Sequence, residues 1–224
     1  MRLFPIIMAL FVTVLLVSNT VAVKITHIGP FYFDGATILF PIAYIFGDIL
    51  TEVYGYKRSR VVVWTGFLAC ITMSFIYWLV GMLPSAEDWH AQSSYMAILG
   101  QTPRIVVASM AAYLCGEFVN AYILARMKVA TQGRHLWSRT IGSTILGQGV
   151  DTVIFVIIAF AGVIPGNLLL YMILSNYIFK TAFEVLATPL TYAAVGYVKK
   201  VESIDYFDKD TNFNPFRVSF RDIG

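Results

Sequence analysis

Five acidic side chains and one lysine lie within apolar stretches of this sequence: Asp48, Glu52, Glu117, Asp151, Glu184 and Lys180. An ionised side chain in lipid costs several kcal/mol unless it is paired or hydrated. Because one cation cannot neutralise five carboxylates, we expect some of these acids to be protonated, or to bind a ligand or ion of positive charge. These residues are therefore the first candidates for a functional site.

Helical spacing extends this set, since residues three or four positions apart share a helix face. The faces so formed are Tyr44, Asp48 and Glu52; Tyr113, Glu117 and Asn120; Thr144, Gln148 and Asp151; and Tyr177, Lys180, Glu184 and Thr188. A carboxylate accepts two parallel hydrogen bonds from a planar ring, an amide binds its carbonyl group, and an aromatic side chain stacks on its face. The faces suit a small, polar, planar ligand, although physics alone does not select one.

Plainer explanations stay open for several of these residues. Lys180 and Glu184 are four positions apart and can form a structural ion pair with each other. Asp48 and Glu52 can lie at the membrane interface, where the cations of residues 57–60 would neutralise them.

The composition predicts that the segments carrying these side chains lie in a membrane. Of the 224 residues, 58% are hydrophobic and 13% charged, whereas a soluble domain has roughly 25% charged residues. The cysteines, Cys70 and Cys115, fall in apolar segments without metal-ligand spacing, so we expect neither a metal nor a cofactor. The sequence contains no nucleotide phosphate loop, and its basic residues form no nucleic-acid face.

Six apolar stretches are long enough for membrane-spanning helices, so we expect an all-α polytopic fold. They cover residues 3–23, 37–54, 61–83, 104–125, 138–163 and 168–198. The first could be a secretory signal, but its end is a poor cleavage site. The loop after the third helix leaves room for a short interfacial helix, and Pro189 predicts a kink in the sixth. We expect a six-helix transmembrane domain over residues 1–198 and a C-terminal tail over 199–224.

The basic residues predict the orientation of these helices. All 16 Lys and Arg residues except Lys24, Arg104 and Lys180 fall on one side of a six-helix arrangement. Loops rich in Lys and Arg face the cytoplasm, so we expect both termini to be cytoplasmic. The tail carries several aromatic residues and is expected to pack against the cytoplasmic face.

Four blocks of sequence resemble the queuosine precursor transporter family, also called the vitamin uptake transporter family. The blocks contain Phe40-Pro41 and Gly47 to Tyr56; Cys115 to Asn120; Arg139 to Thr144 with Gly147-Gln148 and Asp151-Thr152; and Lys180, Glu184-Val185 and Thr188 to Tyr192. The resemblance implies a bacterial inner-membrane protein that imports 7-cyano-7-deazaguanine, 7-aminomethyl-7-deazaguanine or queuine for modification of transfer RNA. The last two carry an extra amine, for which a second intramembrane acid is a natural partner.

Our hypothesis is a transporter whose substrate contacts the residues that share these faces. The candidate contacts are Asp48, Glu52, Tyr113, Glu117, Asn120, Gln148, Asp151, Tyr177, Lys180 and Glu184. We expect Glu117 and Asp151 to matter most, because helix rise places both well inside the bilayer.

Two other classes of protein are considered. A substrate-binding subunit of a larger, nucleotide-driven importer would also have six helices without a motor. An intramembrane enzyme is disfavoured, because all three histidines fall in predicted loops and no hydrolase or metalloprotease motif occurs. The oligomeric state stays open, and a homodimer is allowed.

Overall fold

A computed structural model describes residues 1–130, 136–204, 214 and 216 of the chain. The elements in order are α1 (Phe4–Val21), β1 (Ile25–Ile28), β2 (Phe31–Asp34), the 3-10 turn η1 (Gly35–Leu39), α2 (Phe40–Tyr54), α3 (Tyr56–Gly81), α4 (Gln92–Ile98), the 3-10 turn η2 (Leu99–Gln101), α5 (Thr102–Ala130), α6 (Leu136–Phe160) and α7 (Gly166–Glu202). Each of the six expected apolar stretches contains a helix, namely α1, α2, α3, α5, α6 and α7. The short helix expected after the third one is α4.

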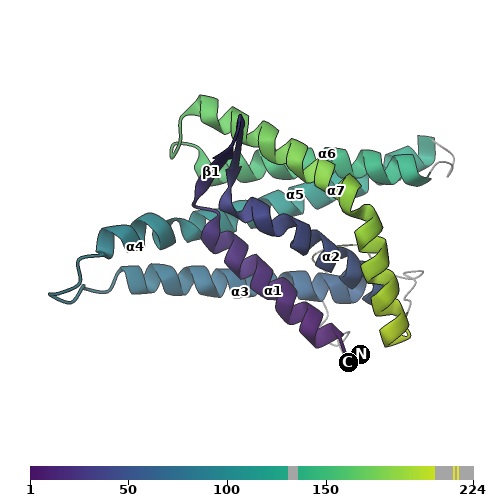
Figure 1. Ribbon diagram of the computed structural model, residues 1–224, viewed down its shortest axis with the longest axis horizontal. Helices are drawn as coiled ribbons and strands as arrows, with labels where there is room; N and C mark the ends of the chain where they lie inside the picture. The colour runs from purple at the N-terminus through teal and green to yellow at the C-terminus, as the bar shows by residue number, and fades with distance from the viewer. Residues whose placement is uncertain (131–135, 205–213, 215, 217–224) are drawn as a thin grey trace.

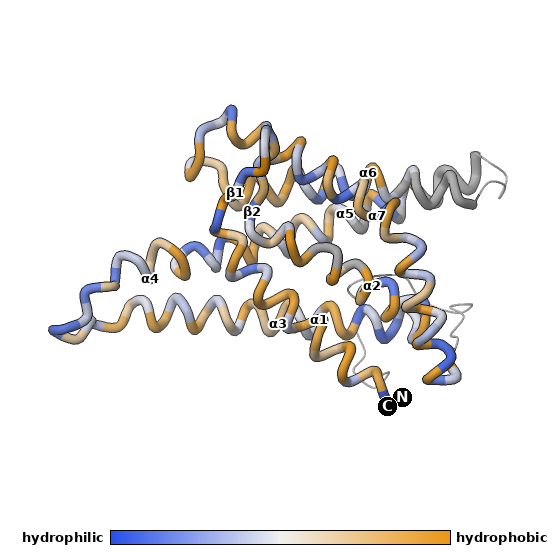
Figure 2. Tube along the Cα trace, in the orientation of Figure 1, coloured by the Kyte–Doolittle hydropathy of each residue, from blue (hydrophilic) through white to orange (hydrophobic). Residues whose placement is uncertain are grey.

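Four helical segments are long and apolar enough to cross a membrane, as judged over the described residues. They are Phe4–Val21, Tyr56–Gly81, Gln92–Gly116 and Gly166–Glu202. In α6 the apolar helical stretch is the shorter Thr144–Phe160. Figure 2 shows hydrophobic residues along the helices and hydrophilic ones in the loop between α3 and α4, which agrees with helices that span a bilayer.

Helices α5 and α6 pack along each other, and α3 lies across the molecule from them with α4 returning beside it (Figure 1). Helix α1 crosses α3, and α2 contacts both α3 and α7 (Figure 1). Helix α7 contacts α6, α2 and strand β2, and it changes direction along its length (Figure 1). Pro189 lies inside α7, and a proline there removes a backbone hydrogen bond and favours the observed bend.

The segment between α1 and α2 differs from the expected loop, because it forms an antiparallel β-hairpin. Ile25 pairs with Asp34, and Ile28 pairs with Phe31. Gly29 turns the chain with φ +58°, a conformation that glycine adopts without steric cost. The β-branched and aromatic residues on either side of Gly29-Pro30 are the strand signal that an expectation of helices passed over.

Helices α5 and α6 approach each other closely at two glycines. A Cβ atom on Gly147 would lie 3.0 Å from both the Cβ of Asn120 and the carbonyl oxygen of Gly116. A Cβ on Gly116 would lie 3.0 Å from the Cβ of Asp151. Small residues let membrane helices approach closely, so these two glycines set the distance between α5 and α6. They also bring Asp151 against the backbone of α5.

Glu202 joins the end of α7 to the beginning of α1. Its carboxylate accepts hydrogen bonds from the backbone N–H of Arg2 at 3.0 Å and from that of Leu3. The Tyr54 hydroxyl, at the end of α2, donates to the same carboxylate at 3.3 Å. The Glu202 side chain is only 2% exposed. The beginning of α1 and the ends of α2 and α7 therefore lie together at one end of the molecule.

Two described residues of the tail contact the first half of α3. Arg60 donates a hydrogen bond from Nη1 to the carbonyl oxygen of Asn214 at 2.7 Å. The ring of Phe216 lies 6.0 Å from that of Trp64. These contacts agree with the expected packing of the tail, of which residues 205–213, 215 and 217–224 lie outside the described chain.

Candidate functional site

The strongest charge contact between described helices joins α6 to α7. The Lys180 ammonium lies 2.7 Å from Oδ2 of Asp151. Lys180 is 2% exposed, whereas the Asp151 side chain is 25% exposed. A charge-assisted pair of this kind is strong where water is excluded. Sequence analysis left the partner of Lys180 open, and the structure pairs it with Asp151.

A second group of polar side chains lies one helical turn further along α7. Glu184 is half-buried, and the amide of Gln148 on α6 hydrogen-bonds to its carboxylate. The charge of Asp48 on α2 acts on the same carboxylate and repels it. Within the described part of the chain, the buried Oε2 atom of Glu184 has no hydrogen-bond donor. Two facing carboxylates favour the binding of a proton, a cation or a ligand that donates hydrogen bonds.

The structure adds a buried carboxylate that sequence analysis missed. Asp34, at the end of β2, is 1% exposed and accepts a hydrogen bond from Nδ2 of Asn176 on α7 at 2.9 Å. The backbone N–H of Ala36 donates to Oδ1 at 3.0 Å, and the Thr37 hydroxyl donates to Oδ1 of Asn176 at 3.0 Å. Burial raises the pKa of Asp34, and the charge of Lys180 and these hydrogen bonds oppose that rise only in part.

Two signals in the sequence could have revealed this group. Asn176 lies four residues before Lys180 and therefore shares its helix face. An aspartate just before a glycine and a helical turn commonly binds the backbone two residues on, as Asp34 does with Ala36.

Three of the remaining predicted residues, Tyr177, Asn120 and Tyr113, pack against α6 or α3. Tyr177 contacts α6, because a Cβ on Gly149 would lie 3.5 Å from its ring. Asn120 packs against Gly147. Tyr113 packs against Phe67 of α3, with ring centroids 5.3 Å apart.

Two other predicted acids are Glu52 and Glu117. Glu52 is 65% exposed and lies 3.4 Å from the ammonium of Lys199 on α7, whereas the interfacial explanation expected its cation to come from residues 57–60. The side chain of Glu117 lies outside the described residues, although Gly116 beside it packs against Asp151. The structure therefore brings together Asp48, Gln148, Asp151, Lys180 and Glu184, from α2, α6 and α7.

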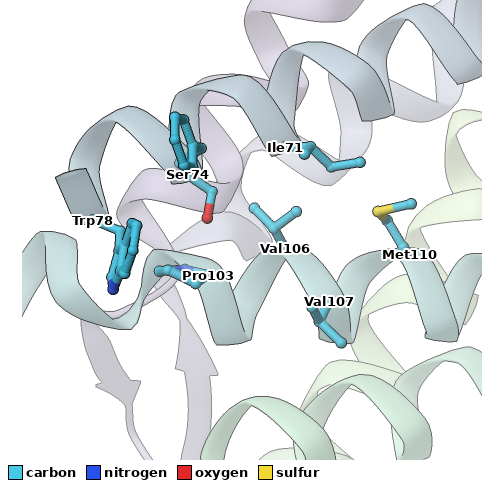
Figure 3. A pocket seen from close by; sticks show the side chains of 8 residues that line it. Ile71, Ser74, Trp78, Pro103, Val106, Val107 and Met110 are labelled. Atoms are coloured by element: carbon cyan, nitrogen blue, oxygen red, sulfur yellow. The ribbon is translucent and has the colours of Figure 1, made fainter.

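A separate hollow of about 460 Å³ lies between α3 and α5. Its lining consists of Ile71, Ser74, Phe75, Trp78, Pro103, Val106, Val107 and Met110. Figure 3 shows the Ser74 hydroxyl among otherwise apolar side chains. Because this lining carries no charge, the hollow suits a hydrocarbon chain better than a polar planar molecule.

Apolar helices that enclose a buried ion pair and facing carboxylates define a polytopic helical membrane protein. A family model described as "Putative vitamin uptake transporter" matches residues 34–194. The chain belongs to this vitamin uptake transporter family. The matched segment begins at Asp34 and includes every residue of the two polar groups described above.

Curated relatives agree with this family. The chain is 32% identical to a Bacillus subtilis protein named "Probable queuosine precursor transporter", over 66% of this chain and 65% of that protein. It is 22% identical to the Escherichia coli "Queuosine precursor transporter", over 68% of this chain and 67% of that protein. The first match thus spans slightly less than two thirds of the relative's length. No solved structure matches the chain significantly.

Proposed function

We propose that this protein imports a queuosine precursor across the bacterial inner membrane. Membership of the vitamin uptake transporter family carries the proposal, together with relatives named as queuosine precursor transporters. The candidate substrates are 7-cyano-7-deazaguanine, 7-aminomethyl-7-deazaguanine and queuine, bases that serve the modification of transfer RNA.

The substrate site of this proposal lies where α2, α6 and α7 meet. A deazaguanine presents a ring N–H and an exocyclic amine side by side, and a carboxylate accepts both. Asp151 has an exposed edge for such a contact, and Glu184 has a buried oxygen that can accept a donor. Gln148 can bind the ring carbonyl, and Tyr177 can stack on the ring. The proposed substrate route also includes Glu117, Asn120, Tyr113, Asp48 and Glu52.

The proposed topology has six membrane spans and both termini in the cytoplasm. The contact between Glu202 and the first residues of α1 supports termini on one side, as an even number of spans requires. The basic residues 57–60 begin α3 near the same end. The positive-inside rule then assigns this end to the cytoplasm.

Uptake of a labelled base tests the function and the site. Cells that cannot make the base would express the wild type, Asp151→Asn, Glu184→Gln or Glu117→Gln at matched levels. Wild-type cells should accumulate the label, and each variant should lose about tenfold or more of the rate, equal to ~1.4 kcal/mol of binding or barrier. Glu87→Gln, in an exposed loop, is the matched control and should transport normally.

Two results would count against the proposal. Wild-type cells that accumulate none of the three bases would exclude the function. Normal uptake by all three variants would not contradict the function, but it would show that the proposed site is wrong.

Transport by the purified protein in liposomes separates a complete transporter from a binding subunit. We expect the protein alone to move the base across the liposome membrane. Binding without movement would favour the alternative that it serves a nucleotide-driven importer, since the sequence has no nucleotide-binding loop of its own.

A further inference from the structure

A second buried carboxylate, Asp34, binds the same face of α7 that carries Lys180. Asp34 is fixed to α7 through Asn176, and Lys180 lies four residues further along the same helix face. The charges of Lys180 and Asp34 attract each other. Lys180 and Asp34 are 2% and 1% exposed, so water does little to stabilise either charge. One buried ammonium is thus available to two carboxylates, Asp151 and Asp34.

The two carboxylates differ in access from outside. The Asp151 side chain is 25% exposed and can meet a ligand, while Lys180 lies behind it in the protein interior. Asp34 is buried between the hairpin and α7, where a ligand does not reach it. A ligand that donates hydrogen bonds to Asp151 therefore competes with the Lys180 ammonium.

A displaced ammonium needs another partner, because a buried charge that loses its counterion costs several kcal/mol. The Asp34 carboxylate has acceptor capacity left after its bonds to Asn176 and Ala36, since its two oxygens offer about four lone-pair positions.

We propose that Asp34 is a positioning residue, which takes over the ion pair of Lys180 when the substrate binds Asp151. This inference rests on the proposed function, because it takes Asp151 as a substrate contact. It also links the site to the hairpin. Asp34 ends β2, and the backbone N–H of Tyr32 in the same strand donates to the Ser175 hydroxyl of α7 at 3.0 Å. Substrate binding would then strengthen the attachment of the hairpin to α7.

A double-mutant cycle on the substrate-free protein provides the first test. The full chain is purified in detergent, and the thermal midpoint is measured for D34N, K180M and D34N/K180M. Removing Lys180 alone leaves the buried Asp34 and the partly exposed Asp151 without a cation, so K180M should have the lowest midpoint. The double variant should recover part of that loss. Additive losses would show that Asp34 and Lys180 are not coupled, and would overturn the proposal.

Binding of radiolabelled 7-cyano-7-deazaguanine provides the second test. The D34N variant keeps a side-chain oxygen that can accept from Asn176, but it cannot stabilise a displaced ammonium. Its affinity should fall about tenfold or more, equal to ~1.4 kcal/mol. The D34N/K180M variant should bind more tightly than D34N, since no ammonium competes for Asp151.

A purely structural role for Asp34 predicts a different pattern. N176A removes the hydrogen bond from Asn176 to Asp34 but keeps the charges of Asp34, Asp151 and Lys180. If N176A weakens binding as much as D34N, and D34N/K180M shows no recovery, Asp34 acts only as a structural link and the inference is wrong. The same conclusion follows if D34N binds as tightly as the wild type.

The two proposals fail in distinguishable ways. A wild type that binds none of the three bases excludes the proposed function, and the substrate-free cycle then decides the coupling of Asp34 to Lys180 by itself. If K180M does not fold, the comparison of D34N with N176A in the binding assay decides the inference.

Discussion

At the scale of single residues, sequence spacing located most of the charged groups but did not pair them. The i, i+4 rule offered Glu184 as a partner for Lys180, whereas the structure pairs Lys180 with Asp151 on α6. Spacing along one helix cannot show which neighbouring helix packs against it. Asp34 was missed for a related reason, since it reaches α7 only through the hairpin.

Glu202 supports a prediction about stability at this scale. Its carboxylate accepts hydrogen bonds from two N–H groups at the beginning of α1 and from Tyr54. Glu202→Ala removes this cap, which should cost about 1–2 kcal/mol. For a chain of this length, each kcal/mol lowers the thermal midpoint by roughly 2–4 °C. Thermal unfolding in detergent, followed by tryptophan fluorescence, measures the midpoint.

The control for this experiment is Glu87→Ala, which removes an exposed carboxylate from the loop after α3. Its midpoint should equal that of the wild type. Equal midpoints for both variants would show that the Glu202 contacts contribute nothing measurable.

At the scale of elements, the helices were predictable and the hairpin was not. A bilayer demands long apolar runs, so the six helices stand out in the sequence. Each strand of the hairpin has four residues, and a short apolar run can be read as a strand or as part of a helix. The pairing of the strands also depends on contacts with α7, which lies far away in the chain.

The crossing of α5 and α6 yields a prediction with an internal control. Gly147→Ala places a methyl group 3.0 Å from the Asn120 Cβ and the Gly116 carbonyl oxygen, so the helices must separate slightly. Gly196→Ala, in the interior of α7, meets no atom within 4 Å. Both substitutions raise helix propensity by up to about 1 kcal/mol. The thermal midpoint of Gly147→Ala should therefore lie below that of Gly196→Ala, and the reverse order would mean that α5 and α6 are not in tight contact there.

At the scale of the whole molecule, the cluster of basic residues and an even number of helices predict that both termini lie on one side of the membrane. The contact of Glu202 with Arg2 places the end of α7 beside the beginning of α1. The positive-inside rule predicts that this end of the molecule faces the cytoplasm.

Cysteine labelling in cells tests this orientation. In a background with Cys70→Ala and Cys115→Ala, a single cysteine is introduced as Glu87→Cys or as Ser203→Cys. Both positions are exposed, in the loop after α3 and directly after α7. A membrane-impermeant maleimide should label position 87 in cells with a permeabilised outer membrane, and position 203 only after the inner membrane is broken. The opposite pattern would invert the topology.

The long final helix has a consequence for how the protein is made. Helix α7 supplies Asn176 and Lys180 to Asp34, and Glu202 to the first turn of α1. The ribosome makes α7 after the other described helices, so Asp34 and the N–H groups before α1 lack these partners until α7 has been made. A nascent chain that stops before α7 would keep a bare carboxylate in its interior, and cellular quality control would remove it.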